Sequence, residues 1–243
     1  LHADDLKLSG ESPSQALAQV GELLQRSGSI PYDRIELAAP SCELDLDGQG
    51  FKFTIQDVAG EFVIDPTNPT LRMAYRIIEP DGGSRCELTL NRNRGVDPVE
   101  SSIVMKTIEG SPLPSRVLDV FFPSGEWLGA AAKVDGTLAL KQVGNRPWEA
   151  EFSGNPLNVD LQTLVRNRFH HHHLVGTARI GLQSARWGDR PGQGPGWREI
   201  KGDLLVGQGT IGLDLLNALG REMKFRLSSR AARLDPRKPE VEF

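Results

Sequence analysis

Apolar and polar residues alternate one by one along most of this chain. The period of two is clearest at 51–56, 71–78, 148–153 and 223–228. Such alternation places apolar side chains on one face of a strand and polar side chains on the other. It is typical of antiparallel strands that are wet on one face. The pattern therefore predicts a mainly β protein with roughly a dozen strands.

One segment near the start has a different period. Ser12, Pro13 and Gln15 have the order of a helix N-terminus, with a serine N-cap and a proline in the first helical position. Apolar residues then recur at helical spacing until Gly28. We expect one long amphipathic helix at 13–26. Its polar face lacks clustered Lys and Arg, which favours a lid packed on the sheet over a helix on an anionic membrane surface.

Shorter helical segments bounded by proline or glycine are predicted at 114–122, 160–166 and 214–219, as connectors between strands. Two stretches rich in glycine and proline, 81–84 and 188–196, are predicted to be turn or loop tips. The second is long enough for a disordered loop.

A motif of the form apolar-x-Gly-x-apolar-x-apolar occurs four times, around Gly60, Gly136, Gly176 and Gly202. A glycine inside a strand costs conformational entropy and removes packing, so its repeated placement indicates bends, bulges or local twist in a large sheet. Four ordinary strand starts in a glycine-rich β protein are the alternative interpretation.

A second motif links strands to short helices. The sequence at 154–164 is similar to that at 209–219, and in both a strand ends in apolar-Asp-Leu before a helical turn. Asp160 and Asp214 are placed to cap the exposed N–H groups of that turn. We therefore interpret both residues as helix caps and not as catalytic acids.

These two motifs together resemble the C-terminal repeat region of AsmA-like proteins and their relatives of the translocation-and-assembly-module type. The resemblance is best over 101–230 and is only a general β pattern over 30–100, while the 189–196 loop and a histidine tract depart from it. It implies an elongated, curved sheet with an apolar concave face. It also implies a large envelope protein of a two-membrane bacterium, anchored in the inner membrane and concerned with lipid transport or outer-membrane assembly and integrity.

The expected fold is thus a large curved antiparallel sheet built of repeats, with one N-terminal amphipathic helix and short connecting helices. The expected divisions are an N-terminal segment with the helix at 1–29, a first β region at 30–110, an AsmA-like repeat β region at 111–232 and a tail at 233–243. We expect the chain to be a segment of a longer protein, so that other parts of that protein are its partners and its membrane attachment lies outside it.

Composition excludes one class of partner. The formal net charge is −4 and the basic residues are scattered, so no electrostatic footprint for nucleic acid is present. No apolar run approaches the roughly 18 residues that a membrane-spanning helix needs. The two cysteines, Cys42 and Cys86, fit neither a disulfide-dense scaffold nor a metal quartet. Buried free thiols are the expectation for both, and a Cys42–Cys86 bridge is the alternative.

Candidate chemistry is sparse. His170, His171, His172 and His173 are consecutive, but neighbouring residues on a strand face opposite sides, so at most two of them converge on one ion. We expect an exposed polar turn and no metal site. Nucleophile-elbow, phosphate-loop, dinucleotide and Cys-x-x-Cys motifs are absent from the sequence. We therefore expect neither an enzyme nor a cofactor.

Three functions compete. The first is a lipid-handling or assembly scaffold whose apolar groove contacts phospholipid or acyl chains. The second is a structural or adhesive module that buries the same face dry, and the third is a β-sheet glycan hydrolase with carboxylates from distant strands. The groove candidates are the residues in the apolar phase of their strands: Phe53, Ile55, Leu138, Leu140, Phe152, Ile180, Leu204, Phe225 and Leu227.

Overall fold

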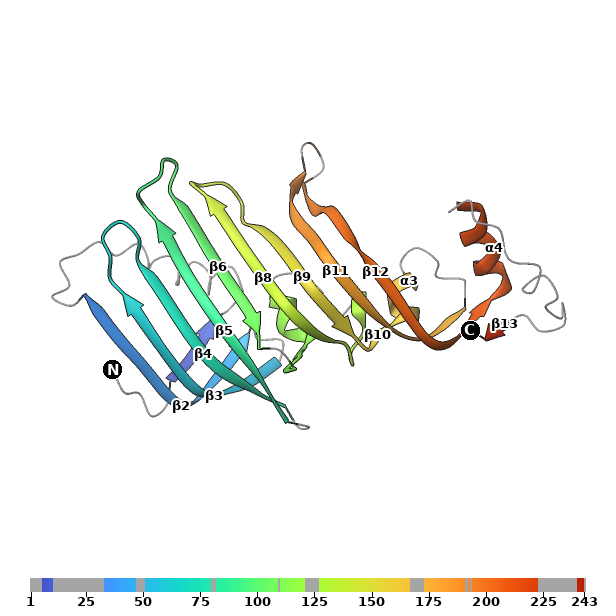
Figure 1. Ribbon diagram of the computed structural model, residues 1–243, viewed down its shortest axis with the longest axis horizontal. Helices are drawn as coiled ribbons and strands as arrows, with labels where there is room; N and C mark the ends of the chain where they lie inside the picture. Colours follow the sequence, from blue (N-terminus) through green and yellow to red (C-terminus); the bar gives the residue numbers. More distant parts are fainter. Residues whose placement is uncertain are drawn as a thin grey trace.

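The computed structural model forms one elongated, mainly β structure, as the sequence predicts (Figure 1). The residues that the structure describes are 6–10, 33–46, 51–79, 82–108, 110–120, 127–166, 173–190, 192, 194–222 and 240–242. The helix expected at 13–26 lies outside them. The same is true of most of the tail at 233–243.

Thirteen strands join in a single sheet among the described residues. They are β1 (Leu6–Gly10), β2 (Arg34–Leu46), β3 (Phe51–Val63), β4 (Thr70–Glu79), β5 (Gly82–Asn93), β6 (Glu100–Thr107), β7 (Leu113–Pro114), β8 (Lys133–Val143), β9 (Glu149–Leu157), β10 (Val159–Asp160), β11 (Leu174–Arg190), β12 (Gly194–Gly212) and β13 (Glu240–Glu242).

The strands follow one another in space almost as they do in the chain, in the order β1-β2-β3-β4-β5-β6-β8-β9-β11-β12-β13, with β7 beside β8 and β10 beside β11. All the pairings are antiparallel except that of β1 with β2, which is parallel. The sheet continues across residue 110, where the two β regions of the sequence meet, because β6 pairs directly with β8.

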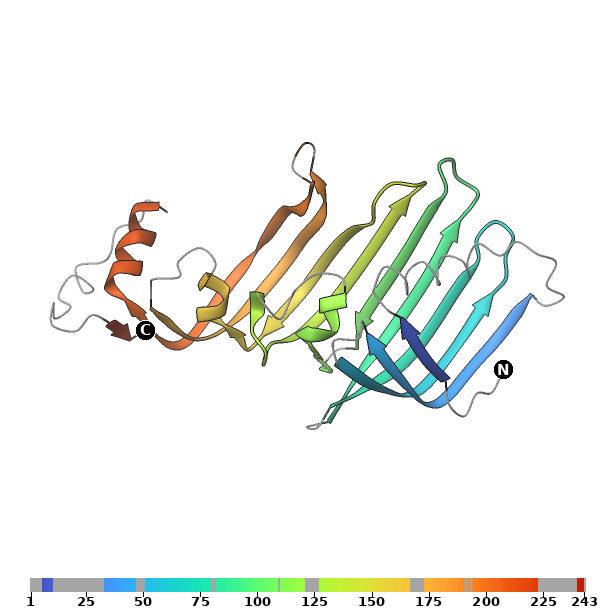
Figure 2. The same ribbon diagram turned by 180° about the vertical axis from the view of Figure 1, so that it is seen from behind.

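Three short helices connect strands at the positions where the sequence predicts connectors. They are η1 (Ser115–Val120), a 3₁₀ helix, and the α-helices α3 (Leu161–Arg166) and α4 (Leu213–Glu222). Figure 2 shows η1 and α3 on one side of the sheet. The opposite side carries no described helix in front of its central strands (Figure 1).

The expectation of a long loop at 188–196 is wrong. β11 and β12 pair as far as Arg190 and Gly194, so the two paired strands are three residues apart in the sequence. Pro195 opposes Asp189 within this ladder, and β12 tolerates it because no described strand pairs with the other side of β12 there. Trp187 and Trp197 strengthen the hairpin through an edge-to-face contact with ring centroids 5.2 Å apart.

Cross-strand pairing aligns the apolar residues of successive strands into two rows on one face of the sheet. The first row is Ile35, Phe62, Leu71, Leu90, Ile103, Leu140, Ala150, Trp187 and Trp197. The second row is Leu37, Gly60, Met73, Leu88, Met105, Leu138, Phe152, Ala185 and Ile200. Each row runs from β2 to β12, so the sheet has one continuous apolar face.

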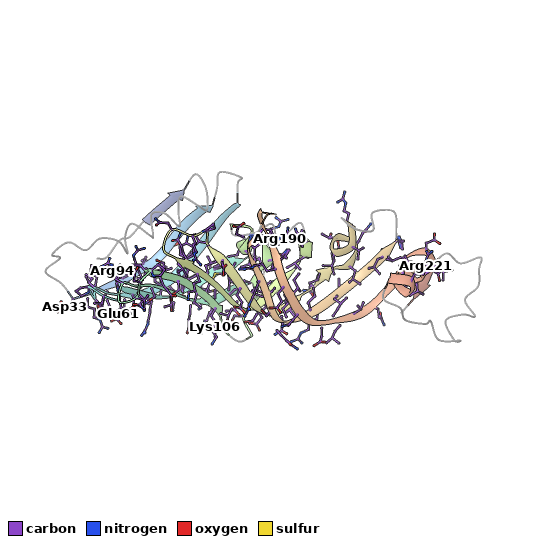
Figure 3. The ribbon with its side chains drawn as sticks, turned by 90° about the horizontal axis from the view of Figure 1, so that it is seen from above. Asp33, Glu61, Arg94, Lys106, Arg190 and Arg221 are labelled. Atoms are coloured by element: carbon purple, nitrogen blue, oxygen red, sulfur yellow. The ribbon has the colours of Figure 1, made fainter. Side chains whose placement is uncertain are left out.

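The sheet bends where its ladders are irregular. One extra residue of β3 lies between Gln56 and Ala59, and Asp57 there has a φ of 54°, which marks a bulge. The Asp57 carboxylate pairs with Arg76 on β4 at 3.4 Å. Bulges increase local twist, and the N-terminal strands accordingly leave the mean plane of the sheet when it is seen from above (Figure 3).

Gly136 and Gly154 face each other on β8 and β9, at a close approach of the two backbones. A Cβ on Gly136 would overlap the carbonyl oxygen of Ser153 and would lie 2.7 Å from the Gly154 Cα. Gly154 has a φ of 148°, which side chains other than glycine rarely adopt. Both residues therefore let two backbones approach more closely than any side chain allows.

Replacing Gly136 with Ala is expected to destabilise the fold by more than about 2 kcal/mol, because the new methyl group can be accommodated only if β8 and β9 separate. Gly181→Ala is the matched control, since a Cβ on this strand glycine would meet nothing closer than 3.9 Å. Urea unfolding followed by circular dichroism measures both free energies of unfolding. Equal losses in the two variants would contradict the crowding argument.

Candidate functional site

The apolar face is the candidate site, and its centre is covered by the chain itself. Leu113, Val117 and Leu118, from β7 and η1, are buried in the same core cluster as Leu138 and Phe152. This segment lies across the apolar side of the central strands in Figure 2. The middle of the face is therefore a packed core, in which Leu138 is 2% exposed.

The apolar face is more accessible away from this covered centre. On the N-terminal half, Leu37, Met73, Leu88 and Met105 are partly exposed and occupy successive places in the second apolar row, with only Gly60 between the first two. They form a strip of aliphatic and thioether side chains that we call the β2–β6 strip. No charged residue interrupts this row.

The groove candidates of the sequence fall into three groups. Ile55, Leu138, Leu140 and Phe152 are 2–7% exposed and belong to the main core cluster. Ile180 is partly buried against a second cluster, and Leu204 opposite it on β12 is 49% exposed. Phe225 and Leu227 lie outside the described residues, and so does the side chain of Phe53.

Sequence reasoning missed the residues of the face that are accessible. Met73, Leu88, Met105 and Val206 have the same alternating phase as the residues it selected, so the period of two could have included them. Which members of one phase stay accessible depends on where β7 and η1 cross the sheet. That is a long-range property with no local signal.

The second core cluster lies under the short helices. Val159, Leu161, Leu174, Ala178, Ile211 and Leu215 form it, and Ile180 packs against it. Asp160 precedes α3 and accepts a hydrogen bond from the Gln162 N–H at 3.0 Å, which is N-cap geometry. Asp214 instead occupies the second position of α4, because that helix begins at Leu213. Its negative charge still lies in the first turn, where the helix dipole favours it.

The four glycines of the repeated apolar-x-Gly-x-apolar-x-apolar motif all lie within strands, but the atoms around them differ. A Cβ on Gly60 would lie 2.8 Å from the Arg72 carbonyl oxygen, and one on Gly202 would overlap that of Gly181. Gly176, with a φ of 143°, would bring a Cβ to 3.0 Å from the Gln208 carbonyl oxygen. Together with Gly136, each of the four thus stands where a neighbouring backbone approaches closely.

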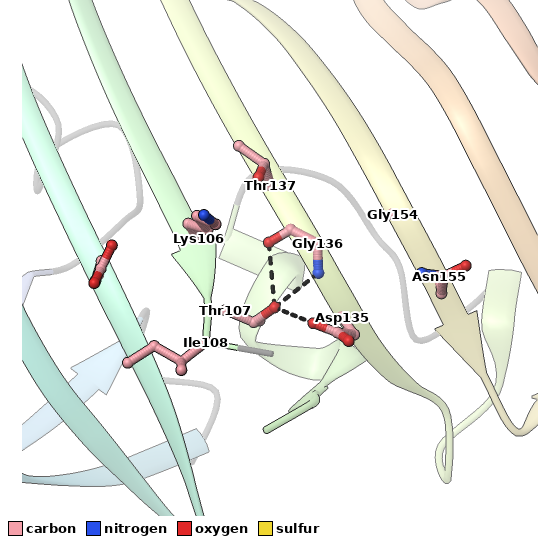
Figure 4. Close-up of a pocket in the computed structure, with 9 residues that line it drawn as sticks. Lys106, Thr107, Ile108, Asp135, Gly136, Thr137, Gly154 and Asn155 are labelled. Atoms are coloured by element: carbon pink, nitrogen blue, oxygen red, sulfur yellow. Dashed lines mark hydrogen bonds between the residues drawn. The ribbon is translucent and has the colours of Figure 1, made fainter. Parts of the chain in front are cut away.

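A surface pocket of about 400 Å³ lies near the end of β6, lined in part by Glu87, Lys106 and Asp135 (Figure 4). The Thr107 hydroxyl donates a hydrogen bond to the Asp135 carboxylate and accepts one from the Gly136 N–H at 2.8 Å. These bonds tie β6 to β8, so Asp135 and Thr107 have a structural role in the pocket.

Two carboxylates have pKa values that are lowered, as is typical of surface residues that form hydrogen bonds and ion pairs. Hydrogen bonds from the Thr67 side chain and backbone hold the pKa of Asp65 below its usual value, and a hydrogen bond and the charge of Lys201 lower the pKa of Glu199. Asp65 is exposed and Glu199 is partly exposed, and both carboxylates stay ionised at neutral pH. A general acid in a glycan hydrolase requires the opposite shift.

Among the described residues, no group of three or more His, Cys, Asp or Glu side chains is placed to hold a metal ion. His173 is exposed, and its Nε2 lies 3.3 Å from the Thr210 hydroxyl. The other three histidines of the tract lie outside the described residues. No described helix is both long and apolar enough to cross a membrane.

Cys86 is a free thiol, fully buried on β5. Burial raises its pKa to about 12, and burial also raises the pKa of Tyr75, its partner on β4. Cys42 lies on β2, with β3 and β4 between it and β5. The alternative of a Cys42–Cys86 bridge is therefore wrong.

No protein-family model, curated protein or solved structure matches this chain.

Because the folded protein retains the Cys86 proton to a higher pH than the unfolded chain, the unfolded state binds fewer protons above pH 9.0, the ordinary thiol pKa. We therefore expect the free energy of unfolding to fall as the pH rises from 9.0 toward about 12. Cys86→Val should make this fall less steep, while Tyr75 continues to contribute in the same direction. Urea unfolding of both proteins across this pH range measures the two slopes, and identical slopes would contradict the assignment.

Proposed function

We propose that this chain is a non-enzymatic, lipid-handling module of the AsmA-like type, and that acyl chains bind along its apolar face. The observation that carries the proposal is the alignment of apolar residues into two rows that run from β2 to β12. Over the accessible β2–β6 strip, an acyl chain would meet apolar side chains from four strands, β2, β4, β5 and β6.

The energetics of this contact suit a hydrocarbon ligand. Each buried CH₂ group contributes about 0.8 kcal/mol, and no hydrogen bond is required to direct it. The β2–β6 strip adds two methionines, Met73 and Met105, whose unbranched thioether side chains adapt to ligands of varied shape. A face of this kind binds chains by length and selects weakly among lipid types.

The opposite face favours a position in water. In the register of Met73, Leu88 and Met105, the neighbouring residues Arg72, Glu87 and Lys106 point away from the apolar face. Arg72, Glu87 and Lys106 are all exposed. An elongated sheet with one wet and one apolar face supports a conduit or scaffold in the aqueous periplasm, attached to the inner membrane through other parts of a longer protein.

A purely structural module is the second candidate, and the burial of the central residues favours it. Leu138, Leu140 and Phe152 are at most 6% exposed, so the chain covers them without any ligand. In this alternative the β2–β6 strip is the margin of a dry core. The two candidates therefore make opposite predictions for that strip.

A substitution in the strip separates them. Met105→Glu is expected to reduce uptake of a fluorescent fatty acid by at least about tenfold, because the carboxylate would have to be desolvated by the acyl chain. Val104→Glu is the matched control, since Val104 neighbours Met105 on β6, is similarly half-buried and faces the polar side. Fluorescence titration measures binding, and circular dichroism verifies the fold of each variant.

Protein purified without detergent should also carry extractable lipid, which mass spectrometry identifies. Absence of both bound lipid and fatty-acid uptake in the unchanged protein would leave the structural module as the better description. So would an equal loss of uptake in the two glutamate variants.

A further inference from the structure

In the part of the chain that the structure describes, most of the outer edge of β12 is open. Among the described residues, β13 pairs only with Thr210, Ile211 and Gly212, and β11 occupies the other side of the strand. The backbone of β12 from Gly194 to Gly209 therefore has no described strand on its outer side. Figure 1 shows it as the last long strand of the sheet. Open edges carry unpaired N–H and C=O groups that can pair with another strand.

This edge is also the most apolar exposed segment that the structure describes. Ile200, Leu204, Leu205 and Val206 are 57%, 49%, 66% and 40% exposed. Ile200, Leu204 and Val206 share the apolar face with their β11 partners, whereas Leu205 points to the polar face. Four large apolar side chains within seven residues form a patch that a monomer leaves in water.

The patch coincides with the regular part of the strand. β12 has one extra residue between Glu199 and Trp197, and another between Gly209 and Val206, relative to β11. Between these bulges, residues 199–206 have no extra residue on β12. A partner strand requires such a regular edge, and bulges normally end a pairing.

We propose that this edge pairs antiparallel with the same edge of a second copy of the chain, about a two-fold axis at Gly202. The register follows from the geometry of antiparallel pairing, in which only residues of the same phase can oppose each other. When a strand pairs with its own copy, a residue can therefore face only residues an even number of positions away in the sequence. The two-fold axis then passes through a residue, and the numbers of two opposing residues add up to twice its number. That condition leaves few registers within 199–206.

The two-fold axis at Gly202 gives complementary neighbours. Lys201 opposes Asp203 of the second copy, and Ile200 opposes its Leu204, each contact occurring twice. Shifting the axis to Lys201 would oppose Lys201 to its own copy and Glu199 to Asp203. Shifting it to Asp203 would oppose Asp203 to its own copy. Like charges directly across a ladder destabilise it, so these two registers are disfavoured.

More distant registers fit less well. An axis at Ile200 opposes Glu199 to Lys201, but it carries the pairing across the bulge at Arg198 and sets Leu204 against Gly196. An axis at Leu204 forms no pair of opposite charges, because Lys201 faces Gly207 and Asp203 faces Leu205, and it reaches the other bulge. Only the axis at Gly202 combines opposite charges, apposed aliphatic side chains and a regular backbone.

A lysine on an edge strand is a common protection against pairing. Here Lys201 is 64% exposed and already contacts Glu199 on its own strand. In the proposed pair, Asp203 of the second copy neutralises the same lysine. Lys201 therefore excludes most partner strands while it admits this one.

The paired edges would join the apolar rows of two copies, since Ile200 is the last member of the second row. With the axis at Gly202 the ladder covers residues 199–205, because Glu199 faces Leu205 and the bulge at Arg198 follows, and β13 begins only at Thr210. The dimer does not depend on lipid binding, and its test needs no lipid.

Charge exchange tests the register directly in the full chain, because Lys201 and Asp203 are exposed and their replacement leaves the core unchanged. Sedimentation equilibrium should show dimers of the unchanged protein, and Lys201→Asp or Asp203→Lys alone should raise the dissociation constant at least about tenfold. An equimolar mixture of the two single variants should form a heterodimer, because each lysine then meets an aspartate across the axis.

Each other outcome overturns the proposal. A monomeric unchanged protein at high micromolar concentration means that this edge is covered by something other than a second copy. Single variants that dimerise as strongly as the unchanged protein place the interface elsewhere. Variants that stay monomeric when they are mixed exclude the axis at Gly202.

Discussion

Each strand of this sheet is held in a register that sets its apolar residues against those of its neighbours. Because side chains alternate between faces, a slip of one residue in any pair would move all the apolar side chains of that strand to the polar face. Met105 illustrates the constraint, since it lies between Leu88 and Leu138 while its neighbour Lys106 lies between Glu87 and Thr137. The core and the apolar face both depend on this alignment.

Keeping such a register over strands of up to 19 residues requires positions where the strain of the twisted ladder is released. A twisted sheet accumulates strain along long ladders, and bulges or glycines release it. The bulge at Asp57 serves the N-terminal strands, and the close approach of Gly136 and Gly154 serves the central ones. The glycines that make the sequence pattern conspicuous are therefore positions where backbones approach, and they do not contribute to the apolar surface.

The sequence predicts the local features of this fold well. Alternation locates strands such as β3, β4 and β9, and the proline and glycine boundaries locate η1, α3 and α4, because both signals depend on neighbouring residues. The tight β11–β12 hairpin was missed because its glycines and Pro195 have the composition of a loop, while pairing along the ladder decides their conformation. Asp214 was predicted to cap its helix, but the helix begins one residue earlier, at Leu213, so Asp214 lies in its first turn. The accessible parts of the apolar face were beyond prediction, since residues distant in sequence cover the rest.

The two long edges of the sheet differ in a way that bears on assembly. β2 carries Arg34 and Glu36 near its start, with side chains 60% and 81% exposed. Pro40, on the same strand, has no backbone N–H group to donate to a neighbouring strand. β1 occupies the rest of that edge from Cys42 to Leu46. Pairing of β12 with β2 of another copy would generate an open filament, because each copy would still expose one edge of each kind. The charges and proline of β2 disfavour that arrangement, whereas β12 paired with itself uses the one apolar edge among the described strands of each copy and closes the assembly at two.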